Sequence, residues 1–311
     1  MRIIFMGTPE FALPSLQILL DNTYDVVGVV TTPSKPQGRG QKVASSPIKK
    51  FAAERKFPLL QPESLKRPDF ISAVKNLQPD LIVVVAFRIL PKEVFTIPRL
   101  GSFNLHASLL PKYRGAAPIN WAIINGEQET GVTTFFLQEK VDTGSVILQA
   151  RVKIGPNETA GELHDTLSDV GAEIVLQTVR LIELGKAQPR IQDETLASPA
   201  PKIFKEDCKI DWSKSSSQVH NFIRGLSPHP CAWTLHQEKI LRLYITELPK
   251  DFSVEHKTGS GEIVEVRKDQ ILVQTRDGIV SVLELQQEGR KRMETAEFLR
   301  GYNLKIGDRL T

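Results

Sequence analysis

The run VKNLQPDLIVVVAF, residues 74–87, decides the fold class. Its second half, residues 81–87, contains only apolar side chains, and most of them are β-branched. A strand with one face in water alternates apolar and polar residues, so an unbroken apolar run indicates a strand buried on both faces. We therefore predict a central strand of a parallel sheet that helices cover on both sides.

The segments on either side of this run alternate between strand-like and helix-like patterns. Strands are expected at residues 2–7, 25–32, 100–111 and 131–138, and helices at residues 9–22, 47–57 and 160–186. The last of these helices places its apolar residues three or four apart, which gives it one apolar face. This alternation predicts a doubly wound, Rossmann-like α/β domain over residues 1–186.

The amino-acid composition of the sequence changes after Gly185. Residues 187–207 are rich in proline and polar side chains, which is typical of a linker. A helical segment follows at residues 215–230, and short alternating strands then continue to a final one at residues 305–310. Regular short strands separated by Gly and Asp turns predict a small OB-like β-barrel domain over residues 208–311.

The composition is that of a globular protein with a substantial core. The chain has 311 residues, of which 41% are hydrophobic and 24% are charged. Its longest strongly apolar run is far too short for a membrane span, and residues 1–7 read as a strand rather than as a targeting peptide. The two cysteines fit neither a disulfide framework nor a metal site. We expect a cytoplasmic protein. We also expect a monomer, because no long coiled-coil pattern is present.

Basic residues are concentrated near the N-terminus. The whole chain has a net charge of +4, but residues 31–58 alone have a net charge of +6, with Glu54 as their one acidic residue. A local basic cluster attracts phosphate groups whatever the global charge, which makes a nucleic-acid partner plausible. A solvated basic surface around a helix is the alternative that charge alone leaves open.

Several common chemical motifs are absent. The first strand runs into GTPEF, residues 7–11, and not into a dinucleotide-binding G-x-G-x-x-G. There is no phosphate-binding G-x-x-x-x-G-K-[ST] and no G-x-S-x-G around a serine. The six histidines form no compact ligand set, so we expect no metal. An oxidoreductase, an ATPase and a serine hydrolase are therefore poorly supported.

Polar residues of catalytic type interrupt the apolar strand in FNLHASLLPKYRGAAP, residues 103–118. Asn104 and His106 are two apart, so their side chains would leave an extended strand on the same side. Asp142, on a glycine-containing turn, is the candidate carboxylate. An amide and an imidazole suit stabilisation of an oxyanion, and a carboxylate suits orientation of the imidazole and proton transfer, which together indicate acyl transfer. The alternative is two satisfied polar groups at a strand end and a turn-forming aspartate.

Longer stretches resemble the folate-dependent formyltransferases. The resemblance lies in residues 1–16, in the loop 38–49, in residues 103–147 with their Asn-x-His-x-Ser-Leu-Leu-Pro and Asp-Thr-Gly motifs, and in RGLSPHPCAW, residues 224–233. It implies that 10-formyltetrahydrofolate donates a formyl group to the α-amino group of methionyl-initiator tRNA, in the bacterial cytoplasm. It also implies that Asn104, His106 and Asp142 are the catalytic residues.

The resemblance further implies which residues hold the folate. Ser108, Leu109, Leu110 and Pro111 match the family's tetrahydrofolate-binding segment. An earlier loop and a later turn would enclose the pterin, with Phe87, Arg88, Ile89, Leu90 and Gln138. The sequence departs from the family at AFRILP, residues 86–91, where many relatives have Ala-Tyr-Gly-x-Ile-Leu-Pro. This contraction places Arg88 where a glycine is expected and affects the rim of the folate pocket.

Two basic groups are implied to bind the tRNA. They are the inserted loop near the N-terminus and a cluster in the C-terminal domain: Lys35, Arg39, Lys42, Arg290, Lys291 and Arg292. Rival interpretations change the acceptor to an amino-sugar nucleotide, to glycinamide ribonucleotide or, in a hydrolase, to water. A tRNA-binding module without catalysis is a rival of another class, and the presence of Asn104, His106 and Asp142 disfavours it.

Overall fold

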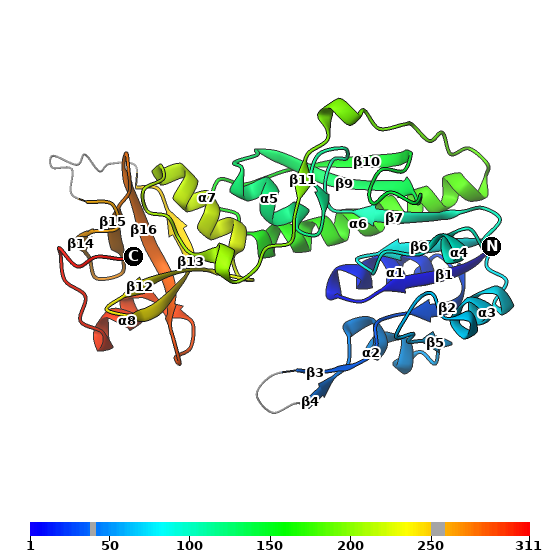
Figure 1. Cartoon of the computed structure of the whole chain (residues 1–311), viewed down its shortest axis with the longest axis horizontal. Coiled ribbons are helices and arrows are strands. Elements are labelled where there is room, and N and C mark those ends of the chain that lie inside the picture. Colours follow the sequence, from blue (N-terminus) through cyan, green and yellow to red (C-terminus); the bar gives the residue numbers. More distant parts are fainter. Residues whose placement is uncertain (38–41, 250–258) are drawn as a thin grey trace. The chain divides into compact units, whose positions relative to one another are not determined.

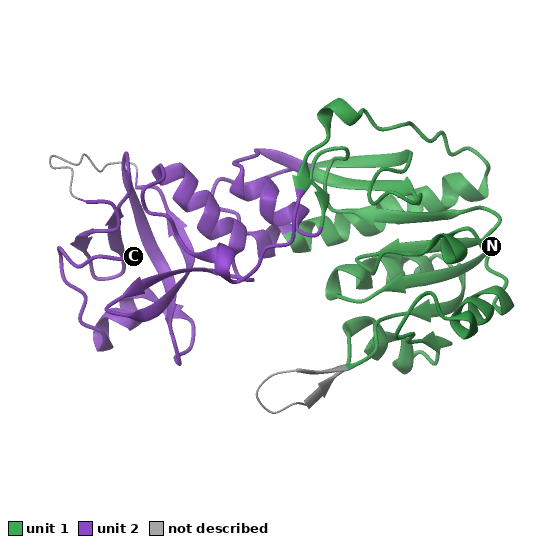
Figure 2. Cartoon of the chain, in the orientation of Figure 1, with its two compact units in different colours: residues 1–115, 131–152, 164–199 green, residues 116–130, 153–163, 200–311 purple. Residues whose placement is uncertain are grey.

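The computed structural model describes residues 1–37, 42–249 and 259–311, without the side chains of residues 35–37 and 42–44. The chain forms two compact units, coloured separately in Figure 2. Unit 1 comprises Met1–Gly115, Gly131–Val152 and His164–Pro199, and unit 2 comprises Ala116–Thr130, Lys153–Leu163 and Ala200–Thr311. The two units therefore interleave along the sequence.

A seven-stranded sheet forms the centre of unit 1 (Figure 1). Its spatial order is β10 (Val146–Lys153), β9 (Glu129–Phe136), β7 (Ser102–His106), β6 (Leu81–Val85), β1 (Arg2–Gly7), β2 (Asp25–Val30) and β5 (Leu59–Leu60). The five strands from β7 to β5 pair in parallel, whereas β9 pairs with β7 in the antiparallel direction. All five residues of β6 are buried, as predicted from the unbroken apolar run at residues 81–87.

Helices cover both faces of this sheet. On one face, Ile4, Met6, Ile82 and Val84 pack against α3 (Pro68–Asn76) and α4 (Lys92–Phe95). On the opposite face lies α6 (Ala160–Glu183), which approaches β7 so closely that a Cβ on Gly171 would be 2.7 Å from Leu105. The predicted parallel α/β domain is thus confirmed.

Shorter elements complete unit 1. They are the 3₁₀ helix η1 (Glu10–Ala12), α1 (Leu13–Asp21), the paired strands β3 (Lys35–Gln37) and β4 (Lys42–Ala44), α2 (Pro47–Glu54), β8 (Arg114–Gly115) and η2 (Glu194–Leu196). Strand β8 pairs with β11 (Pro199–Ala200). Residues 187–199, expected to belong to a linker, are part of this unit.

Unit 2 is built on an antiparallel sheet. Its order is β12 (Ala232–His236), β13 (Lys239–Glu247), β16 (Ile279–Gln287), β15 (Ile271–Gln274) and β14 (Ile263–Val266), with β17 (Met293–Glu294) paired to β16. The helical elements of the unit are α5 (Pro118–Ile124), η3 (Glu206–Cys208), α7 (Ser216–Leu226) and α8 (Thr295–Gly301). One apolar core joins α7 and α8 to the sheet through residues such as Ile223, Leu243 and Phe298.

The predicted antiparallel β-structure of the C-terminal region is confirmed, whereas its closure into an OB-like barrel stays a prediction. The prediction of a strand at residues 305–310 is wrong. Only Arg309 forms a bridge, with Glu262, because the Asp308 carboxylate accepts from the Lys305 N–H and closes a turn at Gly307. Among the residues that the structure describes, no helix is long and apolar enough to cross a lipid bilayer.

Candidate active site

Strand β7 presents Asn104 and His106 on one face of the sheet. In the register of the sheet Asn104 lies beside Val84 of β6 and opposite Phe135 of β9, and His106 lies opposite Thr133. Val84 packs towards α3 and α4, so the two polar side chains leave the strand on that face. The carboxyl end of a central parallel strand is where open α/β sheets place their ligand sites.

The imidazole of His106 has two distinct neighbours. Its Nε2 lies 2.8 Å from the carbonyl oxygen of Tyr113. A carbonyl oxygen only accepts, so Nε2 carries a proton and donates it. Its Nδ1 faces Asp142, at 3.8 Å from Oδ2. The backbone thus fixes the orientation of the ring, so that Nδ1 faces the carboxylate.

Asp142 is held on a tight turn between β9 and β10. Its φ of 54° places it in the left-handed region. Its Oδ2 accepts a 2.9 Å hydrogen bond from the Gly115 N–H, and the side chain is only 11% exposed. Two residues on, a Cβ at Gly144 would lie 1.6 Å from the Phe136 carbonyl oxygen. Only glycine fits there, so the Asp-Thr-Gly motif is a steric requirement of this turn.

Asn104 differs from its neighbours because its amide is free to bind a ligand. The side chain is half-buried. It makes no hydrogen bond to any other residue within the described ranges. Buried or half-buried amides are usually paired, so an unpaired one beside an imidazole and a carboxylate marks a binding position for a hydrogen-bond acceptor.

Within the described part of the chain, neither Ser108 nor the two cysteines are suited to covalent catalysis. The Ser108 hydroxyl is fully buried and donates to the Lys112 carbonyl oxygen at 2.6 Å. Both cysteines belong to unit 2, and burial raises the pKa of each thiol to about 11, so they remain protonated at neutral pH. An amide donor, an imidazole and a carboxylate without a nucleophile suit direct transfer of an acyl group between two substrates.

The residues expected to bind folate have different environments. Leu110 is buried against Phe135 and Val146, and Leu90 is buried with Phe87 packed beside it, so these positions shape the loops. By contrast, Ile89 is 72% exposed. The remaining predicted positions lie at the ends of the same loops: Leu109 and Pro111 are half-buried, and Gln138 donates to Thr143 Oγ1.

Arg88, at the contracted part of the rim, does not extend freely into solvent. Its Nη1 and Nη2 donate to the carbonyl oxygens of Glu63 and Pro62, at 2.9 and 2.7 Å. Burial lowers the pKa of the guanidinium from its ordinary value, although the group stays charged at neutral pH. Arg88 therefore joins the loop after β6 to the loop before α3, which gives it a structural role at this edge.

The predicted basic residues of unit 2 lie around the turn between β16 and β17. Arg290 and Lys291 are exposed. Arg292 is engaged within the unit, because it forms an ion pair with Glu284 and lies over the Tyr244 ring, 4.5 Å from its centroid. Arg39 lies outside the described residues, and so do the side chains of Lys35 and Lys42.

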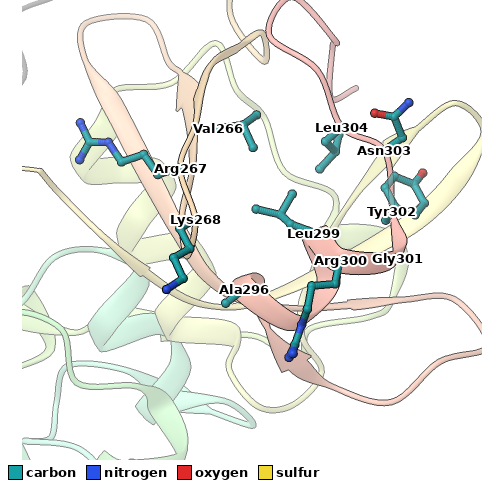
Figure 3. A pocket seen from close by; sticks show the side chains of 10 residues that line it. All are labelled: Val266, Arg267, Lys268, Ala296, Leu299, Arg300, Gly301, Tyr302, Asn303 and Leu304. Atoms are coloured by element: carbon teal, nitrogen blue, oxygen red, sulfur yellow. The ribbon is translucent and has the colours of Figure 1, made fainter.

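A hollow with a basic rim lies elsewhere in unit 2, between α8 and the end of β14 (Figure 3). Its apolar wall includes Leu299 and Leu304, and Lys268 and Arg300 extend towards one side of it (Figure 3). Sequence reasoning missed this hollow because its residues are separated by about thirty positions and form no motif.

Sequence reasoning also missed two main-chain contributors, the Tyr113 carbonyl and the Gly115 N–H. Both orient the His106–Asp142 pair, yet neither depends on a side chain that a sequence pattern detects. The run KYRG, which reads as a turn, was the one available signal.

Comparison with known proteins identifies the family of the chain. Residues 1–179 match the formyl transferase family and residues 202–303 match the formyl transferase C-terminal domain. These two matches define a formyltransferase. The chain belongs to the formyl transferase family and, within it, to the methionyl-tRNA formyltransferases, as its curated relatives indicate.

Two of these relatives illustrate the similarity. The chain is 49% identical to the methionyl-tRNA formyltransferase of Bacteroides thetaiotaomicron over 314 residues, which covers 99% of this chain and 97% of the relative. It is 46% identical to the methionyl-tRNA formyltransferase of Clostridioides difficile over 308 residues, which covers 99% of both.

Solved structures with the same fold are more distant in sequence. WlaRD, a sugar 3N-formyl transferase determined with dTDP and 5-N-formyl-THF, superposes with a TM-score of 0.68 at 22% identity, covering 94% of this chain and 99% of that one. HypX from Aquifex aeolicus in complex with tetrahydrofolic acid superposes with a TM-score of 0.64 at 21% identity. The superposition covers all of this chain, which spans about half the length of HypX.

Proposed function

We propose that this chain transfers the formyl group of 10-formyltetrahydrofolate to the α-amino group of methionyl-initiator tRNA, giving N-formylmethionyl-tRNA for translation initiation. The single observation that best supports the chemistry is the Asn104 amide, which lies beside the His106–Asp142 pair and has no hydrogen-bond partner among the described residues. The near-full-length similarity to methionyl-tRNA formyltransferases supports the choice of acceptor.

Each of the three catalytic residues has a distinct task. Asn104 donates a hydrogen bond to the formyl oxygen as it becomes negative, because its amide has no competing partner within the described residues. His106, fixed through Nε2 on Tyr113, presents Nδ1 towards Asp142 and so keeps the imidazole beside the same developing charge. Asp142 orients the imidazole and accepts a proton from the attacking amine.

The residues around the site fit a folate. The co-substrate supplies an activated formyl group. A flat pterin needs apolar contact and main-chain hydrogen bonds, and two apolar side chains are unusually exposed here, Ile89 at 72% and Val141 at 45%. Phe87–Leu90 and Gln138–Asp142 would enclose it, while Ser108–Pro111 holds the loop that follows β7.

A basic surface in each unit supports the tRNA as partner. In unit 1 the run 31–58 has a net charge of +6, and Arg39 lies between two glycines. In unit 2 Arg290 and Lys291 are exposed, and Lys268 and Arg300 border the hollow in Figure 3. Phosphate contacts of this kind give affinity without reading bases.

The remaining expectations belong to the same proposal. Catalysis is assigned to residues 1–186, and tRNA binding to an OB-like barrel over residues 208–311. Of the segment 187–207 between them, residues 187–199 pack with unit 1. The protein works as a monomer in the bacterial cytoplasm. Antiparallel pairing throughout the β12–β16 sheet supports the barrel.

The deciding experiment is formyl transfer from 10-formyltetrahydrofolate to methionyl-initiator tRNA, with elongator methionyl-tRNA, free methionine and an amino-sugar nucleotide assayed in parallel. We expect formylation of the initiator alone, and a loss of about 10²–10³ in kcat for His106→Ala. Turnover of the sugar nucleotide, or release of formate without formylated tRNA, would keep the chemistry and refute the acceptor.

Salt dependence tests the basic loop separately. If Arg39 contacts a phosphate, Arg39→Ala should raise KM for the tRNA. It should also reduce the slope of log KM against log salt concentration by about one. The KM for the folate should not change. An unaltered salt slope would show that Arg39 does not contact the tRNA backbone.

A further inference from the structure

Gln192, in the segment expected to be a linker, contacts the turn that bears Asp142. Its side chain is buried, with 7% exposed. Its Nε2 donates to the carbonyl oxygens of Asp142 and Gly144, at 2.9 and 2.8 Å. Both amide protons are therefore used to bracket the Asp142 turn from one side.

Arg114 fixes the orientation of that amide. Its Nε and Nη2 donate to Gln192 Oε1, at 3.2 and 2.8 Å. The same guanidinium binds both carboxylate oxygens of Glu194, at 2.9 and 2.7 Å. An arginine only donates, so Oε1 must face Arg114 and Nε2 must face the turn. Glu194 in turn holds Arg114 in place, since bidentate pairs fix the geometry of both partners.

The same segment also contacts the partner of His106. Arg190 and Val146 exchange two main-chain hydrogen bonds of 2.8 Å, which anchors the segment beside the start of β10. At its other end the Ser198 hydroxyl accepts a 2.9 Å bond from the N–H of Tyr113, whose carbonyl oxygen accepts from His106. Residues 190–198 therefore contact the supports of both His106 and Asp142.

We propose that Gln192 is a positioning residue, which keeps the Asp142 carboxylate directed at His106 Nδ1 by holding the carbonyl groups on both sides of Thr143. This inference rests on the proposed formyl transfer. It explains why an amide stands there, because one planar group must donate twice and accept from an arginine. A carboxylate of the same shape accepts from Arg114 but repels the two carbonyl oxygens, and an aliphatic side chain does neither.

The test compares Gln192→Glu, which keeps the shape, and Gln192→Leu, which removes all the hydrogen bonds, with Thr195→Ala as control. The Thr195 hydroxyl lies on the same segment and bonds only to Asp193 among the described residues. We expect kcat for formyl transfer to fall about 10–100-fold in both Gln192 variants, since small misplacements of catalytic groups have effects of this size. KM for the tRNA should change less than about twofold in the Gln192 variants. In the Thr195→Ala control, both kcat and KM should stay within that range, which is the usual scatter of neutral changes.

A double-mutant cycle separates positioning from stability. In an Asp142→Asn background, the Gln192 substitutions should lower kcat no further, because residues that act as a unit are not additive. Any loss of thermal stability should be equal in both backgrounds. A further loss of kcat in the Asp142→Asn background, or unchanged kcat in both single variants, would overturn the inference.

A second readout does not depend on the reaction. The Gly115 N–H donates to Asp142 Oδ2, so its amide exchange with solvent, followed by nuclear magnetic resonance, reports where the carboxylate lies. Faster exchange of Gly115 in the Gln192 variants, with the amides of β6 unchanged, would support positioning. Unchanged exchange would refute it. If the parent chain formylates no initiator tRNA, the proposed function fails, and this measurement still decides the role of Gln192.

Discussion

The amide of Asn104 has no structural partner within the described residues, so its replacement affects chemistry rather than folding. We expect Asn104→Ala to lower kcat about 10²–10³-fold, as for other single oxyanion donors, while the melting temperature stays close to that of the parent. Steady-state kinetics and calorimetry on the same preparation would check this. The matched control is Asn76→Ala, an exposed asparagine on α3, which should leave both quantities unchanged.

The turn between β9 and β10 is the element on which the site depends most. A methyl group at Gly144 would overlap the Phe136 carbonyl oxygen, so the turn must move, and Asp142 with it. We expect Gly144→Ala to lower both kcat, by more than about tenfold, and stability, since displaced catalytic groups and overpacking act together.

Gly185→Ala provides the comparison for Gly144. Gly185 has a φ of 63°, but a Cβ there has no neighbour within 4 Å. This variant should lose about 1–2 kcal/mol through backbone strain alone and keep full activity. Equal loss of activity in the two variants would contradict the steric account of the Asp-Thr-Gly motif.

Helix α7 is joined to the 155–158 loop of unit 2 by a buried arginine. Arg224 is 5% exposed, and its Nη1 donates to the carbonyl oxygens of Gly155 and Glu158, at 3.2 and 2.9 Å. Burial lowers the pKa of its guanidinium. Arg224→Met removes these bonds and leaves the Gly155 and Glu158 carbonyl oxygens without the arginine donor, so we expect a loss of about 1–3 kcal/mol in denaturant unfolding. The surface variant Lys214→Met should show little change.

At the scale of the whole molecule, stability should depend on pH through a buried histidine. His220 bonds to Thr246 Oγ1 and to the Pro156 carbonyl oxygen, and burial lowers its pKa in the folded state. Below about pH 6.5 the histidine binds a proton in the unfolded chain more readily than in the folded chain. The free energy of unfolding therefore falls as the pH decreases, by at most about 1.4 kcal/mol per pH unit.

Unfolding of the parent and of His220→Gln between pH 8 and 5 tests this. The glutamine amide can keep one donor and one acceptor but does not titrate, so its stability curve should be flatter over that range. Parallel curves for the two proteins would assign the pH dependence to other groups. The carboxyl groups whose pKa is lowered, such as that of Asp80, act at lower pH.

The sequence by itself determined the class of the main sheet and the pairing of two candidate catalytic residues. Residues 81–85 are apolar without interruption because a central parallel strand has no face in water, and the burial of all of β6 agrees. Asn104 and His106 share a face because side chains alternate along a strand, which is a local rule. The sequence also placed Asp142 on a glycine-containing turn, whereas the steric demand at Gly144 comes from the Phe136 carbonyl oxygen of the folded chain.

Only the tertiary structure decided what holds these groups in place. The Tyr113 carbonyl and the Gly115 N–H orient His106 and Asp142, and main-chain groups are the same for every residue type, so no pattern reveals them. Gln192 reads as part of a polar linker because its partners lie 48 to 78 positions away. The short-range rules of a sequence fix strands and turns, whereas hydrogen bonds between distant segments exist only once the chain has folded.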